Sequence, residues 1–159
     1  MLKVLKEKKG KTLIYAGTYS GIDEVSNFLV DSERLKESHL LRDFSSWLSE
    51  NYERNWSLTN MVKRGCGLHN GKLHRSLSQL QIKLFEEPLG IDRLVSTSSI
   101  IEGVNTSAEN VIIWRNKNGN ANLKDFTYKN IIGRSGRMFR HFIGHFFLSR
   151  FFEGSLGSQ

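Results

Sequence analysis

Four short apolar segments do most to constrain the fold of this chain. They span residues 12–16, 65–69, 94–97 and 111–114, and polar residues do not alternate regularly within them. Such runs are typical of strands that are buried on both faces. Segments with helical periodicity separate them, which favours parallel strands joined by right-handed crossovers. We therefore expect an open three-layer α/β domain with a mainly parallel sheet and helices on both faces.

The helices expected between these strands follow from the spacing of their apolar residues. A helix with Ser20 as its N-cap presents Ile22 and Val25 on one face. Residues 33–50 predict a long amphipathic helix and residues 56–64 a shorter one, so about 33–64 forms a helical insert. A helix over 75–87 carries Leu77, Leu80, Leu84 and Phe85 on one face and is ended by Pro88. The other expected elements are a helix over 2–9, a solvated loop over 115–124, a helix capped by Asp125 or Thr127, and a last strand over 142–148.

The length of 159 residues fits one domain, which we place at residues 1–150. Residues 153–159 are small and polar, so we place a disordered tail or an artificial boundary at residues 151–159. The longest apolar stretch near the start, residues 13–16, is too short for a signal peptide or a membrane span. A single cysteine, Cys66, excludes an internal disulfide and fits a reducing compartment. We expect a cytoplasmic protein that has no membrane partner.

Positive charge is the clearest indication of a binding partner. The chain has 23 Lys and Arg against 16 Asp and Glu, a net charge of +7 with His neutral. This balance favours a polyanion such as nucleic acid or a nucleotide. The histidines lack a paired cysteine or carboxylate at metal-ligand spacing, so we expect no metal site. Ligands of parallel sheets bind beyond the carboxyl ends of the strands, here the loops after Ala16, His69, Thr97 and Trp114.

One segment near the C-terminal end has the residue types of a phosphate-binding site. Asn130, Arg134 and Arg137 stand at i, i+4 and i+7, which places an amide and two guanidiniums on one helical stripe. Arginine donates paired hydrogen bonds to phosphate oxygens, and Gly133 and Gly136 allow a close backbone approach. A basic helix end that only complements the helix dipole is the alternative, and it stays open on this pattern alone.

Residues 133–137, Gly-Arg-Ser-Gly-Arg, resemble motif VI of the superfamily 2 helicases. Residues 95–108 resemble motif V of these proteins, residues 65–73 are similar to motif IVa, and residues 12–16 are similar to motif IV. The order and spacing agree over about residues 10–148. The Gly-Val-Asn form of motif V and the Gly-x-Gly-x-His start of motif IVa resemble the exosome-associated and archaeal repair helicases more than the DEAD-box branch.

This resemblance implies a RecA-like domain of the P-loop NTPase type, the C-terminal motor domain of an ATP-dependent helicase or translocase. It implies that Arg137 is the arginine finger at the γ-phosphate and that Arg134 lies beside it. Asn130 takes the position of the usual Gln near the attacking water and is one methylene shorter. The resemblance also implies which residues bind the nucleotide, and these are Gly103, Asn105, Glu102, Gly133 and Gly136.

On the nucleic-acid side, the resemblance implies that Thr97 binds a backbone phosphate, with Ser96 next to it. His69, Asn70 and Gly71 would lie on the same side. A hydroxyl and a backbone N–H at a strand end are donors that hold sugar and phosphate without recognising bases. The simpler alternative, that Thr97 caps the next helix, stays open.

The resemblance also implies the partners of the chain. They are DNA or RNA, ATP, and Mg²⁺ held mainly by the N-terminal RecA-like domain of the same full-length protein. No Gly-x-x-x-x-Gly-Lys-[Ser/Thr] loop and no Asp-Glu-x-[Asp/His] cluster occurs in these 159 residues, so we expect no ATP hydrolysis by this fragment alone. Two alternatives stay open: a non-catalytic nucleic-acid-binding module derived from a helicase, and a structural α/β interaction domain.

Other conspicuous residues have structural explanations. Trp47 and Trp56 are expected to pack the insert helices onto the sheet, with base stacking as the alternative. Cys66 lies in an apolar strand without a His and Asp partner pattern, which favours a core position. The lysines between Lys3 and Lys11 are more typical of a solvated helix face than of a binding patch.

Overall fold

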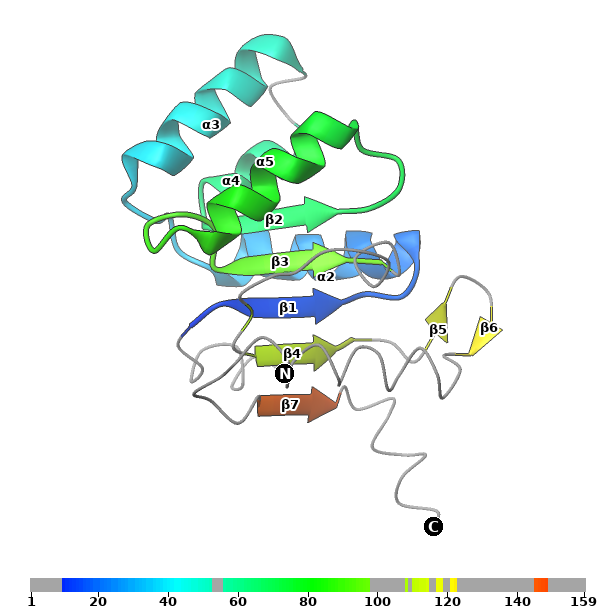
Figure 1. Cartoon of the computed structure of the whole chain (residues 1–159). Coiled ribbons are helices and arrows are strands. Elements are labelled where there is room, and N and C mark those ends of the chain that lie inside the picture. Colours follow the sequence, from blue (N-terminus) through cyan, green and yellow to red (C-terminus); the bar gives the residue numbers. More distant parts are fainter. Residues whose placement is uncertain are drawn as a thin grey trace.

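The computed structural model describes residues 10–52, 56–97, 108, 110–114, 117–118, 121–122 and 145–148 (Figure 1). Its elements in chain order are β1 (Thr12–Tyr15), α2 (Tyr19–Ser32), α3 (His39–Asn51), α4 (Ser57–Val62), β2 (Cys66–His69), α5 (Arg75–Glu86), β3 (Arg93–Ser96), β4 (Asn110–Ile113), β5 (Lys117–Asn118), β6 (Ala121–Asn122) and β7 (His145–Leu148).

Five parallel strands form one sheet in the order β2-β3-β1-β4-β7. The register is continuous across it, because Ile14 of the central strand lies opposite Val95 on one side and Ile112 on the other. Val95 in turn lies opposite Leu68 of β2. The expected α/β class with a mainly parallel sheet is confirmed, and each of the four apolar runs contributes a strand.

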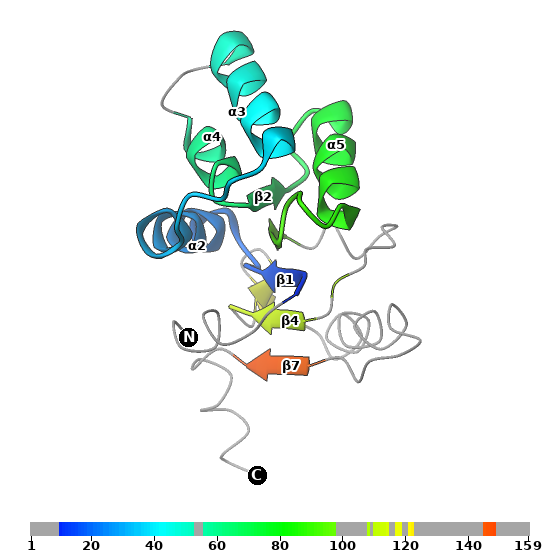
Figure 2. The same ribbon diagram turned by 90° about the vertical axis from the view of Figure 1, so that its left-hand side faces the viewer.

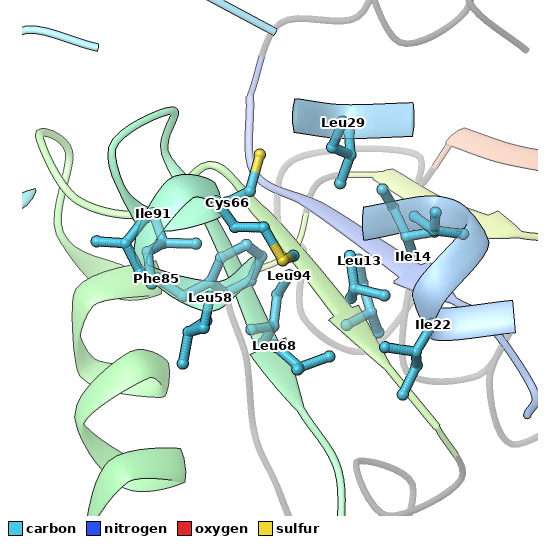
Figure 3. Packing of buried hydrophobic residues seen from close by; sticks show 14 of the residues in the cluster. Leu13, Ile14, Ile22, Leu29, Leu58, Cys66, Leu68, Phe85, Ile91 and Leu94 are labelled. Atoms are coloured by element: carbon cyan, nitrogen blue, oxygen red, sulfur yellow. The ribbon is translucent and has the colours of Figure 1, made fainter. Parts of the chain in front are cut away.

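Helices cover both faces of this sheet (Figure 2). The view shows α2 and α4 on one face and α5 on the other. Apolar side chains fill the space between the layers, with Ile14 close to Ile22 and Leu29 of α2, and Phe85 beside Ile91 on the α5 side (Figure 3). All five are nearly inaccessible to solvent, as the helical spacing of the apolar residues predicts. The three-layer prediction is confirmed.

The predicted long helix over residues 33–50 is wrong. α2 continues to Ser32, and Glu33 ends it with an extended backbone while its N–H donates to Leu29 O at 2.9 Å. The next helix begins only at His39. The Glu33 carboxylate accepts a hydrogen bond from Arg93 Nε at 2.9 Å, which holds this chain reversal against β3.

The segment between the two helices is fixed by contacts with the loop before β3. Ser38 is the N-cap of α3, and its hydroxyl donates to Leu89 O at 2.5 Å. Lys36 Nζ donates to Gly90 O at 2.8 Å and to the Asp92 carboxylate at 2.7 Å. These bonds join residues more than fifty positions apart, so local periodicity does not predict them.

Two smaller expectations also need correction. The N-cap of α2 is Thr18 and not Ser20, because Thr18 Oγ1 accepts the N–H of Gly21 at 3.0 Å. The expected loop over residues 115–124 contains the antiparallel pair β5 and β6, in which Lys117 lies opposite Asn122. The expected helices over 2–9 and at Asp125 or Thr127, and the tail 151–159, lie outside the described residues.

Within the described part of the chain, no helix has the length and apolar character needed to cross a membrane.

Candidate functional site

Three neighbouring strands, β2, β3 and β1, end in a row of polar and aromatic side chains. Tyr15 of β1 lies opposite Ser96 of β3, and Ser96 lies opposite His69 of β2. Residues in register on parallel strands point to the same face, so these three side chains share one face of the sheet. It is the α5 face, because a Cβ built on Gly67, two residues before His69, would lie 2.9 Å from Gln81 Oε1 of α5.

The loops that follow these strands are joined by backbone hydrogen bonds one residue beyond the row. Thr97 N–H donates to His69 O at 3.3 Å, and Ala16 N–H donates to Ser96 O at 2.8 Å. Trp114 N–H donates to Tyr15 O at 2.8 Å. The four loops expected to carry chemistry therefore start along one edge of the sheet, which we call the carboxyl edge.

Helix α2 begins at the carboxyl edge (Figure 1). Gly17 makes the turn into it with a φ of 79°, a value that side chains disfavour. Gly21 is required by close packing, since a Cβ there would lie 2.2 Å from Ala16 O. The first turn of α2 has no acidic residue, so no side chain of that turn offsets the positive end of the helix dipole, which faces this edge.

Helix α5 begins at the same edge after a tight turn. Asn70 Oδ1 accepts the N–H groups of Lys72 at 2.9 Å and Leu73 at 3.0 Å, which fixes the turn. His74 is the N-cap of α5, and the first turn of this helix is also free of acidic residues. Lys72 Nζ lies 4.1 Å from the centroid of the Tyr19 ring, so a cation–π contact connects the starts of the two helices.

Burial controls the protonation of the row along the strand ends. It lowers the pKa of His69 below the usual 6.5, partly offset by a backbone hydrogen bond, so the ring is neutral at neutral pH. Burial also raises the pKa of Tyr15 to about 12. Ser96 is fully buried, and within the described residues its hydroxyl has no hydrogen-bond partner. The row is therefore uncharged, and among the described residues positive charge at the edge comes from Lys72, Arg75 and the positive ends of the two helix dipoles.

The structure describes five of the predicted site residues, and all five lie at the carboxyl edge. Thr97 and Asn70 are half-buried and Gly71 is exposed, whereas His69 and Ser96 are buried. Among the described residues, a Cβ at Gly71 would meet no atom within 4 Å, so their packing leaves room for a side chain there. The other predicted site residues lie outside the described ranges, and they are Asn130, Arg134, Arg137, Glu102, Gly103, Asn105, Gly133 and Gly136.

Three residues that the sequence analysis did not select belong to this edge. They are Thr18, which caps α2, and the contacting pair Tyr19 and Lys72. The N-cap signature before Gly21 and the lysine directly after the Asn70-Gly71 turn are the sequence signals that point to them.

Two further expectations, one about the core position of Cys66 and one about a metal site, concern residues that the structure describes. Cys66 is fully buried, which confirms its core position, and burial raises the pKa of its thiol to about 12. In the part of the chain that the structure describes, no three His, Cys, Asp or Glu side chains form a group able to hold a metal ion.

Comparison with solved structures places this fold. The chain superposes on the C-terminal part of the Fun30 ATPase domain with a TM-score of 0.60 and 18% sequence identity, over 93% of this chain and 38% of that one. This chain has a RecA-like α/β fold. The C-terminal domain of the DEAD-box protein Dbp5 gives a TM-score of 0.42 with 16% identity, over 88% of this chain and 74% of that one, which is too low to bear on the fold.

Sequence comparison gives a nearer relative. The chain is 44% identical over 101 residues to Anti-bacteriophage protein B of Escherichia coli strain K12. The match covers 64% of this chain but only 14% of that protein, so the chain spans a small part of the relative's length. No family model matches the chain. These matches do not bear on the expected helicase branch, which stays a prediction.

Proposed function

We propose that this chain is the C-terminal motor domain of an ATP-dependent superfamily 2 helicase or translocase. The observation that best supports this function is the carboxyl edge. Thr97 and Asn70, predicted to face nucleic acid from the motif resemblance, lie there with the unneutralised N-termini of two helices. The RecA-like fold, the helicase-like order of motifs and the net charge of +7 all agree with this role.

In this proposal the carboxyl edge holds the sugar-phosphate backbone of DNA or RNA. Thr97 contributes its hydroxyl, and Lys72 and the helix N–H groups of α2 and α5 provide positive potential. Contacts of this kind position a strand without recognising its bases. Binding should therefore be independent of sequence and should weaken steeply as the salt concentration rises.

The proposed ATP-side residues lie outside the described ranges and come from the motif resemblance. Arg137 is the arginine finger, Arg134 lies beside it and Asn130 is near the attacking water. A guanidinium delivered from a second domain stabilises the transferring γ-phosphoryl only when the cleft closes, with an effect of ~10³–10⁵ on rate in related NTPases. ATP and Mg²⁺ would be bound mainly by the N-terminal RecA-like domain of the longer protein.

ATP hydrolysis by the full-length protein tests this assignment. Arg137→Ala should lower the turnover number by at least about 100-fold at unchanged thermal stability, because it removes transition-state charge compensation. Arg34→Ala, on an exposed arginine after α2, is the matched control and should hydrolyse ATP like the wild type. An unchanged rate in Arg137→Ala would rule out the finger. Nucleic-acid binding without any ATP turnover by the wild type would instead support the non-catalytic module.

The Escherichia coli relative is named for action against bacteriophage, and we extend that role to the longer protein that contains this chain. Cells that express the full-length protein should then reduce phage plating efficiency. The Arg137→Ala protein, expressed at the same level, should restore plaque formation if motor activity is needed. Equal plating in cells with and without the wild-type protein would argue against this role.

A further inference from the structure

One contact joins the loops that follow β1 and β2, and we call Tyr19 and Lys72 the cation–π pair. The Lys72 ammonium lies 4.1 Å from the centroid of the Tyr19 ring. β3 lies between β1 and β2 in the sheet (Figure 1), so the pair spans the end of that strand. Thr97, which is predicted to bind a backbone phosphate, is the first residue after β3. The pair therefore holds a positive charge on the part of the carboxyl edge where a phosphate is expected.

The backbone is fixed on both sides of the pair. Tyr19 is the first residue of α2 and follows the N-cap Thr18 directly. Lys72 lies in the turn that Asn70 closes, because Asn70 Oδ1 accepts the Lys72 N–H at 2.9 Å. The flexible part of the contact is the four-carbon lysine side chain, and the aromatic ring restricts where its ammonium can lie.

The ammonium of Lys72 is available to an anion. Both members of the pair are exposed, Tyr19 at 46%. Among the described residues, no carboxylate or carbonyl binds the Lys72 ammonium, whereas Lys36 donates to Gly90 O and to the Asp92 carboxylate. An aromatic face attracts a cation without neutralising it, so the full charge of Lys72 remains for a phosphate.

The surroundings of the pair also favour an anion. Tyr19 starts α2, Lys72 lies three residues before the start of α5, and neither helix has an acidic residue in its first turn. Arg75, the first residue of α5, adds a second exposed cation. The first acidic residues of α2, Asp23 and Glu24, belong to its second turn. This local charge, rather than the net charge of the chain, favours a phosphate at the pair.

A polar group of the same edge also lacks a protein partner. Ser96 ends β3, the strand that the pair spans, and it is fully inaccessible to solvent. Within the described residues its hydroxyl has no hydrogen-bond partner. A buried hydroxyl without a partner costs free energy, and such a group is expected where a ligand or an ordered water completes the bonding.

The other exposed aromatic residues in the described part of the chain lack such a cation. Trp47, expected to pack the insert onto the sheet, is instead 45% exposed, so that expectation is not met. Its ring centroid lies 5.9 Å from that of Tyr52, which is 44% exposed. Because Tyr52 contacts other rings and no ammonium, it is a matched control for the loss of an exposed tyrosine.

We propose that Tyr19 is a positioning residue for Lys72 and holds its ammonium toward the end of β3, where it binds a backbone phosphate of the nucleic-acid strand. This inference rests on the proposed function and deepens it, because it assigns one phosphate contact of the carboxyl edge to a named pair. The motif resemblance implies a role for neither residue.

Anisotropy of fluorescein-labelled single-stranded DNA and RNA oligonucleotides with the full-length protein tests the phosphate contact. Lys72→Gln should reduce the magnitude of the slope of log K against log salt by about 0.7, the value for one phosphate contact on a single strand. The same dependence predicts about fivefold weaker binding at about 0.1 M salt. Lys83→Gln, which removes an exposed lysine from the last turn of α5, is the matched control and should bind like the wild type.

A double-mutant cycle tests the positioning role of Tyr19. Tyr19→Leu should weaken binding about two- to fivefold, because the preorganisation supplied by an exposed cation–π contact is lost. Tyr19→Phe keeps a ring for the ammonium and should bind like the wild type, as should the control Tyr52→Leu. In the Lys72→Gln background, Tyr19→Leu should have no further effect. Equal effects of Tyr19→Leu in both backgrounds would overturn the positioning role.

ATP kinetics separate a nucleic-acid phosphate from a phosphate of the nucleotide. At saturating oligonucleotide, the KM for ATP of the full-length protein should be the same in Lys72→Gln and in the wild type. A raised KM with unchanged oligonucleotide affinity would assign the lysine to the nucleotide and overturn the inference. Thermal melting should show that all variants fold, since both side chains of the pair are exposed.

The outcomes distinguish this inference from the proposed function. If the wild type binds oligonucleotides and Thr97→Ala weakens binding while Lys72→Gln does not, the pair only joins two loops, and the inference is wrong while the proposed function stands. If the wild type binds neither DNA nor RNA, both the inference and the proposed nucleic-acid role are wrong.

Discussion

Gln81 Oε1 accepts the N–H of Leu68 at 2.6 Å, and this bond connects α5 to β2. β2 is the terminal strand in the order of the five-stranded sheet. The acceptor for this N–H therefore comes from a helix side chain and not from a neighbouring strand. Gln81 is fully buried, and its Nε2 donates to Leu77 O at 3.4 Å. A buried polar side chain of α5 thus satisfies one backbone N–H of the terminal strand.

Replacement of Gln81 by leucine should destabilise the fold although it makes the helix more apolar. The Leu68 N–H would lose its acceptor in a buried position, which costs ~1–3 kcal/mol. Urea denaturation of the 159-residue chain measures the change in free energy of unfolding. Gln79→Leu, at an exposed position of the same helix, is the matched control and should stay within about 0.5 kcal/mol of the wild type. Equal stabilities of the two variants would contradict this role.

Gly21→Ala should be strongly destabilising because its Cβ would lie 2.2 Å from Ala16 O, a backbone atom that cannot turn away. We expect a loss of about 2 kcal/mol or more in the free energy of unfolding. Gly71→Ala is the comparison, since its Cβ meets nothing within 4 Å. If thermal melting ranked the two variants in the opposite order, the close approach of α2 to the strand end would be wrong.

The pH dependence of stability should contain a contribution from His69. Because burial lowers its pKa below 6.5, the unfolded chain takes up a proton that the folded state resists. The His69 side chain therefore has no effect on the free energy of unfolding above about pH 7, and it lowers that free energy as the pH falls through about 6.5. The wild type should therefore lose more stability than His69→Gln between about pH 7.5 and about pH 5.5. His39→Gln, at an exposed histidine, controls for loss of a histidine as such.

Cys66 should react slowly with thiol reagents in the native protein. Burial raises the pKa of its thiol to about 12, and the side chain is fully inaccessible. Labelling with a chromogenic disulfide at about pH 8 should be at least about 100-fold slower in buffer than in denaturant. Fast labelling of the native chain, at a rate close to that of the unfolded chain, would place the thiol at the surface.

The two-residue strands β5 and β6 contain no apolar run, whereas β1 to β4 were predictable because each coincides with a short apolar run of the kind that is buried in a parallel sheet. The break between α2 and α3 was not, since Ser38 and Lys36 bind the loop at Leu89 and Gly90. For α5, helical spacing selected Leu80, which is 39% exposed, while the buried position belongs to a glutamine. Which position of a helix is buried therefore depends on tertiary contacts, which the spacing of apolar residues does not specify.

The residues of the candidate site also divide into those that the strand order predicts and those that depend on tertiary contacts. His69 and Thr97 were expected at one edge because strand ends of a parallel sheet meet there, and a backbone bond joins them. The contact of Lys72 with Tyr19 was missed, because it depends on how two loops from distant parts of the sequence are placed against each other. Predictions from residue order were therefore most successful where the backbone pattern alone determines the geometry.

The central position of β1 has a consequence for synthesis on the ribosome. β1 is the earliest strand in the described sequence, yet its two neighbours, β3 and β4, come much later in the chain. The nascent segment leaves the exit tunnel with both of its hydrogen-bonding sides unoccupied, and they stay so until Arg93 and Asn110 have followed. Contacts between such distant residues form slowly, so this apolar strand is a natural target for chaperones during translation.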